Sequence, residues 1–179
     1  EVTLVQQCDA KKAIELFNRW AGQPLPLSGA CYLDGKLYAR LSGMNEGVQA
    51  AVDNIGGEPL EQASRFWEQL REQQLPFFSG ETPLWRLSIP AATPPLALDG
   101  TLLLDWGGAQ RWLKSGLPAA AIRDCVSAVG GHATLFRGGD RDSAVFQPLP
   151  AAMLALHQRL KHSLDPAGIF NPGRLYPEL

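Results

Sequence analysis

The stretch ACYLDGKLYARL, residues 30–41, decides the fold class of this chain. Two β-rich runs flank the dipeptide Asp34-Gly35, which tolerates the positive φ angles of a two-residue hairpin turn. The stretch therefore predicts two antiparallel strands that are joined directly. Residues 100–115 repeat this arrangement, with two apolar runs joined at a Gly-Gly pair. The sequence thus predicts a sheet that contains two β-hairpins.

Apolar residues at helical spacing predict helices before, between and after these hairpins. Asp9 is the expected N-cap of the first helix, and Pro118 is expected in the first turn of a later one. We expect helices over residues 10–21, 48–55, 63–70, 118–129 and 153–164, and further strands over residues 2–5, 83–90 and 132–137.

The order of these elements is strand, helix, hairpin, helices, then strand, hairpin, helix, strand, helix, which is two crude copies of one pattern. We predict an α+β fold in which helices pack on one face of an antiparallel sheet, related to the ferredoxin-like arrangement. A wholly parallel α/β sheet is the alternative, and it fits less well because the hairpins leave too few crossover connections. The length of 179 residues predicts one domain over residues 1–179.

Charge and hydropathy exclude two classes of partner. Sixteen basic and eighteen acidic residues give a formal charge of −2, and no segment gathers the basic residues into a stripe that could neutralise phosphates. Nucleic acid is therefore not an expected partner. No apolar run approaches the roughly 20 residues of a membrane helix, and the start lacks the pattern of a signal peptide. We expect a cytoplasmic protein.

The cysteines and most tryptophans are expected to be structural. Three cysteines far apart, with no CxxC pair, support neither a metal site nor a disulfide framework and indicate reduced thiols. Large aromatic side chains most often anchor a core. The cysteines are Cys8, Cys31 and Cys125, and the expected core anchors are Trp67, Trp85, Trp106 and Trp112.

The stretch LDPAGIFNPGRLY, residues 164–176, follows the last predicted helix with two prolines, two glycines and an asparagine. Pro166 halts the helix, and a Pro-Gly pair redirects the chain. Asn171 precedes a proline, which favours an extended backbone. With the preceding helix, the stretch resembles the C-terminal signature of FAD-linked oxidases of the vanillyl-alcohol oxidase type.

Five further segments narrow the resemblance to the FAD-binding subunits of bacterial glycolate oxidases. The segments are PLPLSGACYLDGKLYARLSG, FWEQLREQQLPFF, LWRLSIP, DWGGAQRWLKS and GGHATLFRGGD. Together they extend the resemblance over nearly the whole chain.

The resemblance implies a role for the chain. In the wide family an N-terminal domain binds FAD, and a cap domain roofs the flavin ring where a hydroxy acid is oxidised. This sequence has no glycine-rich turn of the kind that cradles a pyrophosphate. It begins at Glu1 in a strand pattern, so we expect a cap domain that lacks the N-terminal FAD-binding domain of its parent protein and binds no FAD alone.

The partners that the resemblance implies follow from the parent protein. They are its own N-terminal FAD-binding domain, a second flavin subunit, an iron-sulfur subunit and a small 2-hydroxy acid substrate. Any membrane association is expected to arise through the partner subunits.

Oxidation of a 2-hydroxy acid requires a cation that holds the carboxylate and a base that takes the hydroxyl proton while a hydride leaves for the flavin. Arg86, between apolar residues in a predicted strand, is the candidate cation, although such a side chain points either to solvent or into a cleft. His132, which begins a strand after a Gly-Gly pair, is the candidate base. The resemblance implies that Asn171, Arg174 and Tyr176 face the cofactor-binding domain.

One departure from the wider family limits these roles. Hydroxy-acid dehydrogenases of this family that use a metal carry two closely spaced histidines in the cap domain. His132 has no such neighbour, so no metal site is expected. The same gap leaves open whether this subunit oxidises glycolate, relays electrons or supports assembly. The alternative from another class is a freestanding ferredoxin-like module that binds a small ligand or dimerises through its open sheet face.

Overall fold

The computed structural model describes residues 1–140 and 145–179 of the chain. The contacts within it divide the chain into two compact units, Glu1–Gly139 and Asp140–Leu179.

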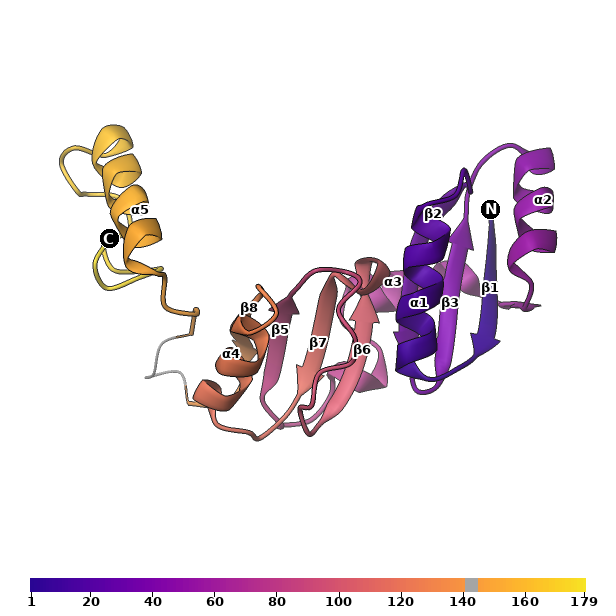
Figure 1. The fold of residues 1–179 in the computed structure, drawn as a ribbon, viewed down its shortest axis with the longest axis horizontal. Helices are drawn as coiled ribbons and strands as arrows, with labels where there is room; N and C mark the ends of the chain where they lie inside the picture. The colour runs from indigo at the N-terminus through magenta and orange to yellow at the C-terminus, as the bar shows by residue number, and fades with distance from the viewer. Residues whose placement is uncertain (141–144) are drawn as a thin grey trace. The chain divides into compact units, whose positions relative to one another are not determined.

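The first unit is built on an antiparallel sheet, as the two predicted hairpins require (Figure 1). The eight strands of its described residues lie in the order β4-β1-β3-β2-β6-β7-β5-β8. Their bounds are β1 Val2–Gln7, β2 Leu27–Leu33, β3 Lys36–Leu41, β4 Glu58–Pro59, β5 Leu84–Ser88, β6 Thr101–Asp105, β7 Gln110–Lys114 and β8 His132–Arg137. The predicted α+β class is confirmed.

The helices of the first unit also lie where apolar spacing predicts them. The described residues of this unit form four α-helices, α1 Ala10–Ala21, α2 Asn45–Ile55, α3 Ala63–Arg71 and α4 Ala119–Ser127. They also form two short 3₁₀ turns, η1 Pro76–Phe78 and η2 Trp106–Gly108. The Asp9 carboxylate caps α1 by accepting a hydrogen bond from the backbone N–H of Lys12 at 2.7 Å. Pro118 is the N-cap of α4, one residue before the predicted position in the first turn.

The strand order shows that the chain contains one pattern twice. β1, α1, β2, β3, α2 and β4 follow the strand-helix-strand-strand-helix-strand order of the ferredoxin-like unit and pair as β4-β1-β3-β2. β5 to β8 pair as β6-β7-β5-β8, which is the same order reversed. In this second copy residues 89–100 replace the helix between the first two strands. The two copies meet where β2 pairs with β6.

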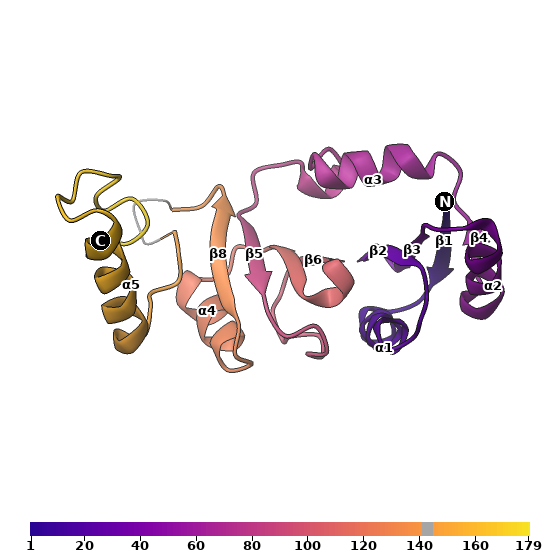
Figure 2. The same ribbon diagram turned by 90° about the horizontal axis from the view of Figure 1, so that it is seen from above.

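The helices divide between the two faces of the sheet (Figure 2). α1 packs on the first copy and α4 packs on the same face of the second copy, over the cluster of Trp85, Leu87 and Leu135. α3 lies on the opposite face, where the Trp67 Nε1–H donates to Thr3 Oγ1 at 2.9 Å. The prediction of helices on one face therefore holds for α1 and α4, while α3 adds partial cover on the other face.

Arg111 holds the segment that replaces a helix in the second copy. Its side chain is 1% exposed. The guanidinium donates to the carbonyl oxygens of Gly108 at 3.2 Å, of Pro94 at 3.0 Å and of Thr93. A helix satisfies its own carbonyls, whereas an irregular segment needs other donors for them. Burial lowers the pKa of Arg111 to about 10, so the group still carries its charge at neutral pH.

The three cysteines differ in burial. Cys31 is buried and its burial raises the pKa of the thiol, whereas Cys8 and Cys125 are only partly buried. None of the three forms a disulfide bond in the structure.

The second unit consists of α5, Ala151–Leu164, and a turn that Asp165 fixes. The Asp165 carboxylate accepts from the backbone N–H groups of Ile169 at 3.1 Å and Phe170 at 2.9 Å, and it pairs with the Lys161 ammonium at 2.6 Å. These donors lower the pKa of Asp165 to about 2, the Lys161 hydrogen bond first. The first half of the terminal motif is therefore a local structural lock.

Candidate functional site

The face of the second copy opposite α4 carries a row of polar side chains. The pairing register places Asp105 on β6 beside Gln110 on β7, Gln110 beside Ser88 on β5, and Ser88 beside His132 on β8. We call these four residues the polar row, and the side of the sheet that carries them the open face. This side is open along the polar row and at Arg86, whereas Trp112 and Leu103 on the same side are buried against residues of α3 and η1.

Arg86 lies on the same open face, in the next row of side chains. It pairs with Trp112 on β7 and with Thr134 on β8, which places it diagonally from His132 on the neighbouring strand. Such diagonal pairs lie about 7–8 Å apart. Both side chains are exposed, and neither has a hydrogen bond or ion pair with a described residue. The fold thus brings the two predicted residues together, while their chemical roles stay predictions.

Sequence reasoning named only His132 of the polar row and missed Ser88, Gln110 and Asp105, of which Asp105 is the charged one. Its carboxylate accepts from the backbone N–H of Trp106 at 2.8 Å and from Gln110 Nε2 at 3.5 Å. Burial raises the pKa of Asp105, although both hydrogen bonds oppose the shift. The sequence indicates Asp105 only by its position directly before the turn of the second hairpin, because loops often carry functional polar residues.

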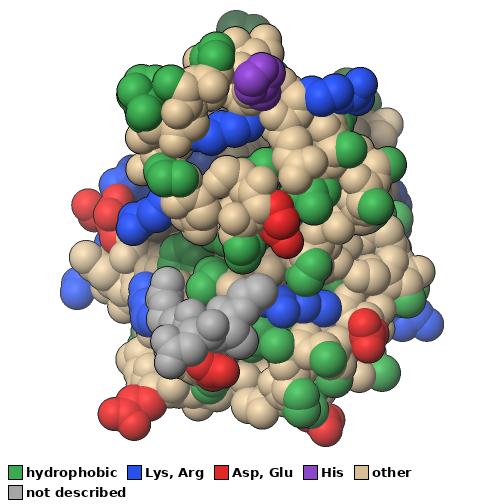
Figure 3. All heavy atoms as spheres, turned by 90° about the vertical axis from the view of Figure 1, so that its left-hand side faces the viewer, with side chains coloured by type: hydrophobic (Ala, Val, Ile, Leu, Met, Phe, Trp, Pro, Cys, Tyr) green, Lys and Arg blue, Asp and Glu red, His purple; other side chains and the backbone are tan. Residues whose placement is uncertain are grey.

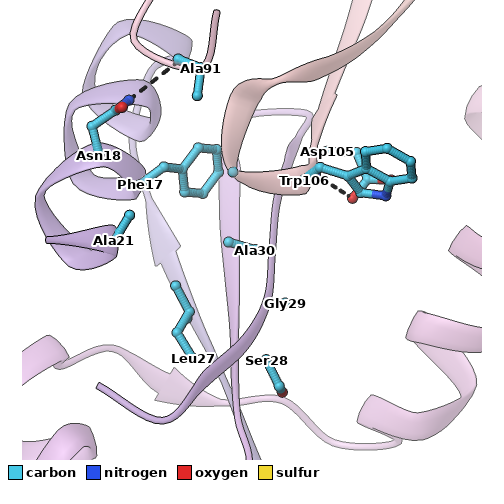
Figure 4. A pocket seen from close by; sticks show the side chains of 11 residues that line it. Phe17, Asn18, Ala21, Leu27, Ser28, Gly29, Ala30, Ala91, Asp105 and Trp106 are labelled. Atoms are coloured by element: carbon cyan, nitrogen blue, oxygen red, sulfur yellow. Dashed lines mark hydrogen bonds between the residues drawn. The ribbon is translucent and has the colours of Figure 1, made fainter. Parts of the chain in front are cut away.

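Two cavities lie where the two copies of the sheet separate. β2 and β6 pair at only two positions, and beyond them the strands diverge. A pocket of about 330 Å³ opens on the side of α1 (Figure 4), and one of about 590 Å³ opens on the side of α3. Both are lined by Ser28, Gly29, Asp105 and Trp106.

Trp106 is not a core anchor, so that prediction was wrong for this residue. Its side chain is 72% exposed, whereas Trp85 and Trp112 are 3% and 6% exposed, as core anchors should be. Figure 4 shows the indole pointing away from the pocket that Phe17 enters. The cause is the turn η2, which places Trp106 in the left-handed region at φ 50°.

The three predicted cofactor-facing residues of the terminal motif differ in environment. Asn171 has φ 47°, so its expected extended backbone was wrong. Its carbonyl instead accepts from the Arg174 N–H at 3.3 Å within a turn. Arg174 is exposed, while the half-buried Tyr176 ring lies 6.3 Å from those of Phe146 and His157. Tyr176 thus packs within its own unit.

The described residues also bear on metal binding, membrane spans and the distribution of surface charge. Among residues 1–140 and 145–179, no cluster of three or more His, Cys, Asp or Glu side chains could hold a metal ion. No helix in this same described part is long and apolar enough to cross a membrane. In the view of Figure 3, basic side chains lie among acidic and apolar ones.

Comparison with known proteins tests the resemblance found in the sequence. The chain is 48% identical over 178 residues to "Glycolate oxidase subunit GlcE" of Escherichia coli (strain K12). The match covers 99% of this chain and 49% of the relative. The chain matches the C-terminal part of a glycolate oxidase subunit. The resemblance recognised in the motifs is confirmed.

Two further comparisons found nothing. No protein family description matches the chain, and no solved structure matches it. The chain spans about half the length of the curated relative it matches.

Proposed function

We propose that the chain is the cap domain of an FAD-dependent 2-hydroxy acid oxidase subunit that acts on glycolate, and that its open face roofs the flavin ring. The observation that carries this proposal is the polar row beside an exposed arginine on the side of the sheet opposite α4. The likeness to a glycolate oxidase subunit supplies the substrate class.

The residues of this chain fit the flavin ring rather than its pyrophosphate. The polar row offers hydrogen-bonding groups on four neighbouring strands. The sequence contains no glycine-rich strand-to-helix turn that could hold phosphates. FAD would therefore be anchored by the other half of the parent protein, and its ring, when bound, accepts the hydride.

Arg86 and His132 would then hold and deprotonate the substrate. The Arg86 guanidinium can take a carboxylate with two parallel hydrogen bonds, because no described residue occupies its donors. His132 lies diagonally across on β8, so its imidazole can accept the proton of a hydroxyl on the adjacent carbon. Ser88 lies between them and can orient the same hydroxyl.

A second role, electron relay or assembly instead of turnover, is favoured by Asp105. Its carboxylate lies in the same row and would repel the carboxylate of a small hydroxy acid. Burial raises the pKa of Asp105, which weakens this repulsion. The two roles differ in what they demand of Arg86.

The proposed partners follow from the same assignment. Asn171, Arg174 and Tyr176 would meet the FAD-binding domain of the parent protein, where the exposed Arg174 offers free donors. A second flavin subunit and an iron-sulfur subunit would complete the oxidase, in the cytoplasm, with any membrane contact made through them.

Steady-state kinetics of the intact subunit in its complex test the proposal. Arg86→Met should raise the KM for glycolate at least 10-fold with unchanged flavin content, because a charged hydrogen bond contributes about 1.5–3 kcal/mol. Arg65→Met, on the exposed surface of α3, is the matched control. His132→Gln should lower kcat, because glutamine cannot take the hydroxyl proton.

Two results would separate the roles. An unchanged KM in Arg86→Met together with slower electron transfer to the acceptor would favour the relay. Full activity in both variants would contradict any role of the open face.

A further inference from the structure

Trp106 combines two features that rarely occur together. Its indole is 72% exposed, the largest exposure of any tryptophan among the described residues, and its backbone lies at φ 50°. A bulky L-residue in the left-handed region is strained, and glycine or asparagine would occupy it more easily. The isolated chain therefore gains nothing from tryptophan at this position.

The turn that presents Trp106 is rigid. Asp105 Oδ1 accepts from the Trp106 N–H at 2.8 Å, and the Trp106 carbonyl accepts from the Ala109 N–H at 3.3 Å. Gly108, at φ 95°, packs so closely that an added Cβ would lie 3.0 Å from the carbonyl oxygen of Ala91. An aromatic side chain on such a turn loses little entropy when it binds a partner.

The surroundings of Trp106 have the form of a docking site. Cavities of about 330 and 590 Å³ flank it on the two faces of the sheet. Apolar side chains, Phe17, Ala30 and Ala91 among them, line the first cavity. Asp105 lines both and has no cation within 4 Å among the described residues. An exposed aromatic beside hollows is typical of an interface anchor.

We propose that Trp106 is the anchor by which this chain docks onto the FAD-binding half of its parent protein. The proposal rests on the proposed function. Two observations favour this occupant: half of the curated relative lies outside the match, and Asp105 joins the Trp106 turn directly to the polar row. The partner surface would bear an apolar slot with a carbonyl acceptor for the indole N–H, and a basic side chain that reaches Asp105.

Collisional quenching of tryptophan fluorescence tests the contact without an activity assay. Iodide should quench Trp106 in the chain alone, because the other four tryptophans are buried or partly buried. In the intact subunit this quenchable fraction should fall at least threefold. Trp106→Phe assigns the signal, since the difference between the two preparations should disappear in that variant.

A variant pair tests the energetic role. Trp106→Asn should leave the Tm of the chain within about 2 °C or raise it, because asparagine tolerates the left-handed backbone. In the intact subunit it should weaken FAD retention at least 10-fold. Met44→Ala, at another strongly exposed apolar side chain (86% exposed), should change neither.

Three outcomes would overturn the proposal. Undiminished iodide quenching in the intact subunit would show that the indole stays in solvent, even if Arg86→Met still impairs glycolate oxidation and the proposed function stands. Protection that grows with the concentration of the chain alone would show that a second copy is the occupant. If Trp106→Asn lowered the Tm of the chain by clearly more than about 2 °C while it weakened FAD retention, the loss of FAD would follow from lower stability. Trp106 would then have only a local structural role.

Discussion

Replacing Arg111 should destabilise the first unit more than any other single change of an arginine. Arg111 is the buried donor for three backbone carbonyls of residues 93–108, in the copy of the pattern that lacks a helix. Arg111→Met keeps much of the apolar stem and removes all three hydrogen bonds. Asn18 and Ser115 also donate to this segment, but to the carbonyls of Ala91 and Asp99.

The magnitude follows from the environment of each carbonyl. The hydrogen bond to Gly108 is buried, and its loss costs about 1–3 kcal/mol. Those to Pro94 and Thr93 are part-buried, so water can replace the donor and each costs about 0.5–1.5 kcal/mol. Relief of a buried charge offsets part of the sum and leaves about 3 kcal/mol. For a chain of this length, that lowers the Tm by about 6–12 °C.

Thermal unfolding followed by circular dichroism measures the effect. Arg86→Met is the matched control, because the same substitution at an exposed arginine should stay within about 0.5 kcal/mol. Hydrogen exchange should also speed up selectively in residues 91–98. A Tm loss in Arg111→Met no larger than that of the control would refute the claim that Arg111 holds the segment that replaces a helix.

The remaining predictions concern backbone space, acid stability and the cofactor. Gly131→Ala should cost at least about 2 kcal/mol in urea unfolding, because a Cβ would lie 2.4 Å from the Ile89 side chain, whereas Gly47→Ala, with open space in a helix, should be neutral or stabilising. The stability that Asp165 contributes should be complete above its unfolded pKa of about 3.9 and lost as pH falls through about 2, which an NMR titration of the amides it caps would show. The chain alone should bind FAD weakly or not at all, and submicromolar quenching of flavin fluorescence would contradict this. Arg174→Ala should change the free energy of unfolding of the chain by no more than about 0.5 kcal/mol, but it should weaken FAD retention in the intact subunit.

The hairpins and helices could be predicted because local chemistry decides them. Asp34 and Gly35 adopt φ 49° and 74°, the geometry of the turn that the dipeptide favours. Asp9 caps α1 for a similarly local reason. The two-residue strand β4 escaped prediction because its pairing with β1 depends on a distant partner and not on its own pattern.

The site could be predicted only in part because it depends on register between strands. Arg86 and His132 were identified from residue type and position, but their placement on one face follows from the pairing of β5 with β8. Asp105 joins the same row through β7, a relation that no local pattern encodes. Trp106 was misjudged because hydrophobicity favours burial, whereas the turn geometry of η2 exposes the ring.

A structure of the intact subunit with FAD bound tests the central claim most directly, through the distances from the isoalloxazine ring to the open face. The account predicts that the ring lies within about 4 Å of at least one of Arg86, Ser88 and His132. A ring that lies against the α1 and α4 face, or that makes no contact with β5, β7 or β8, would contradict it.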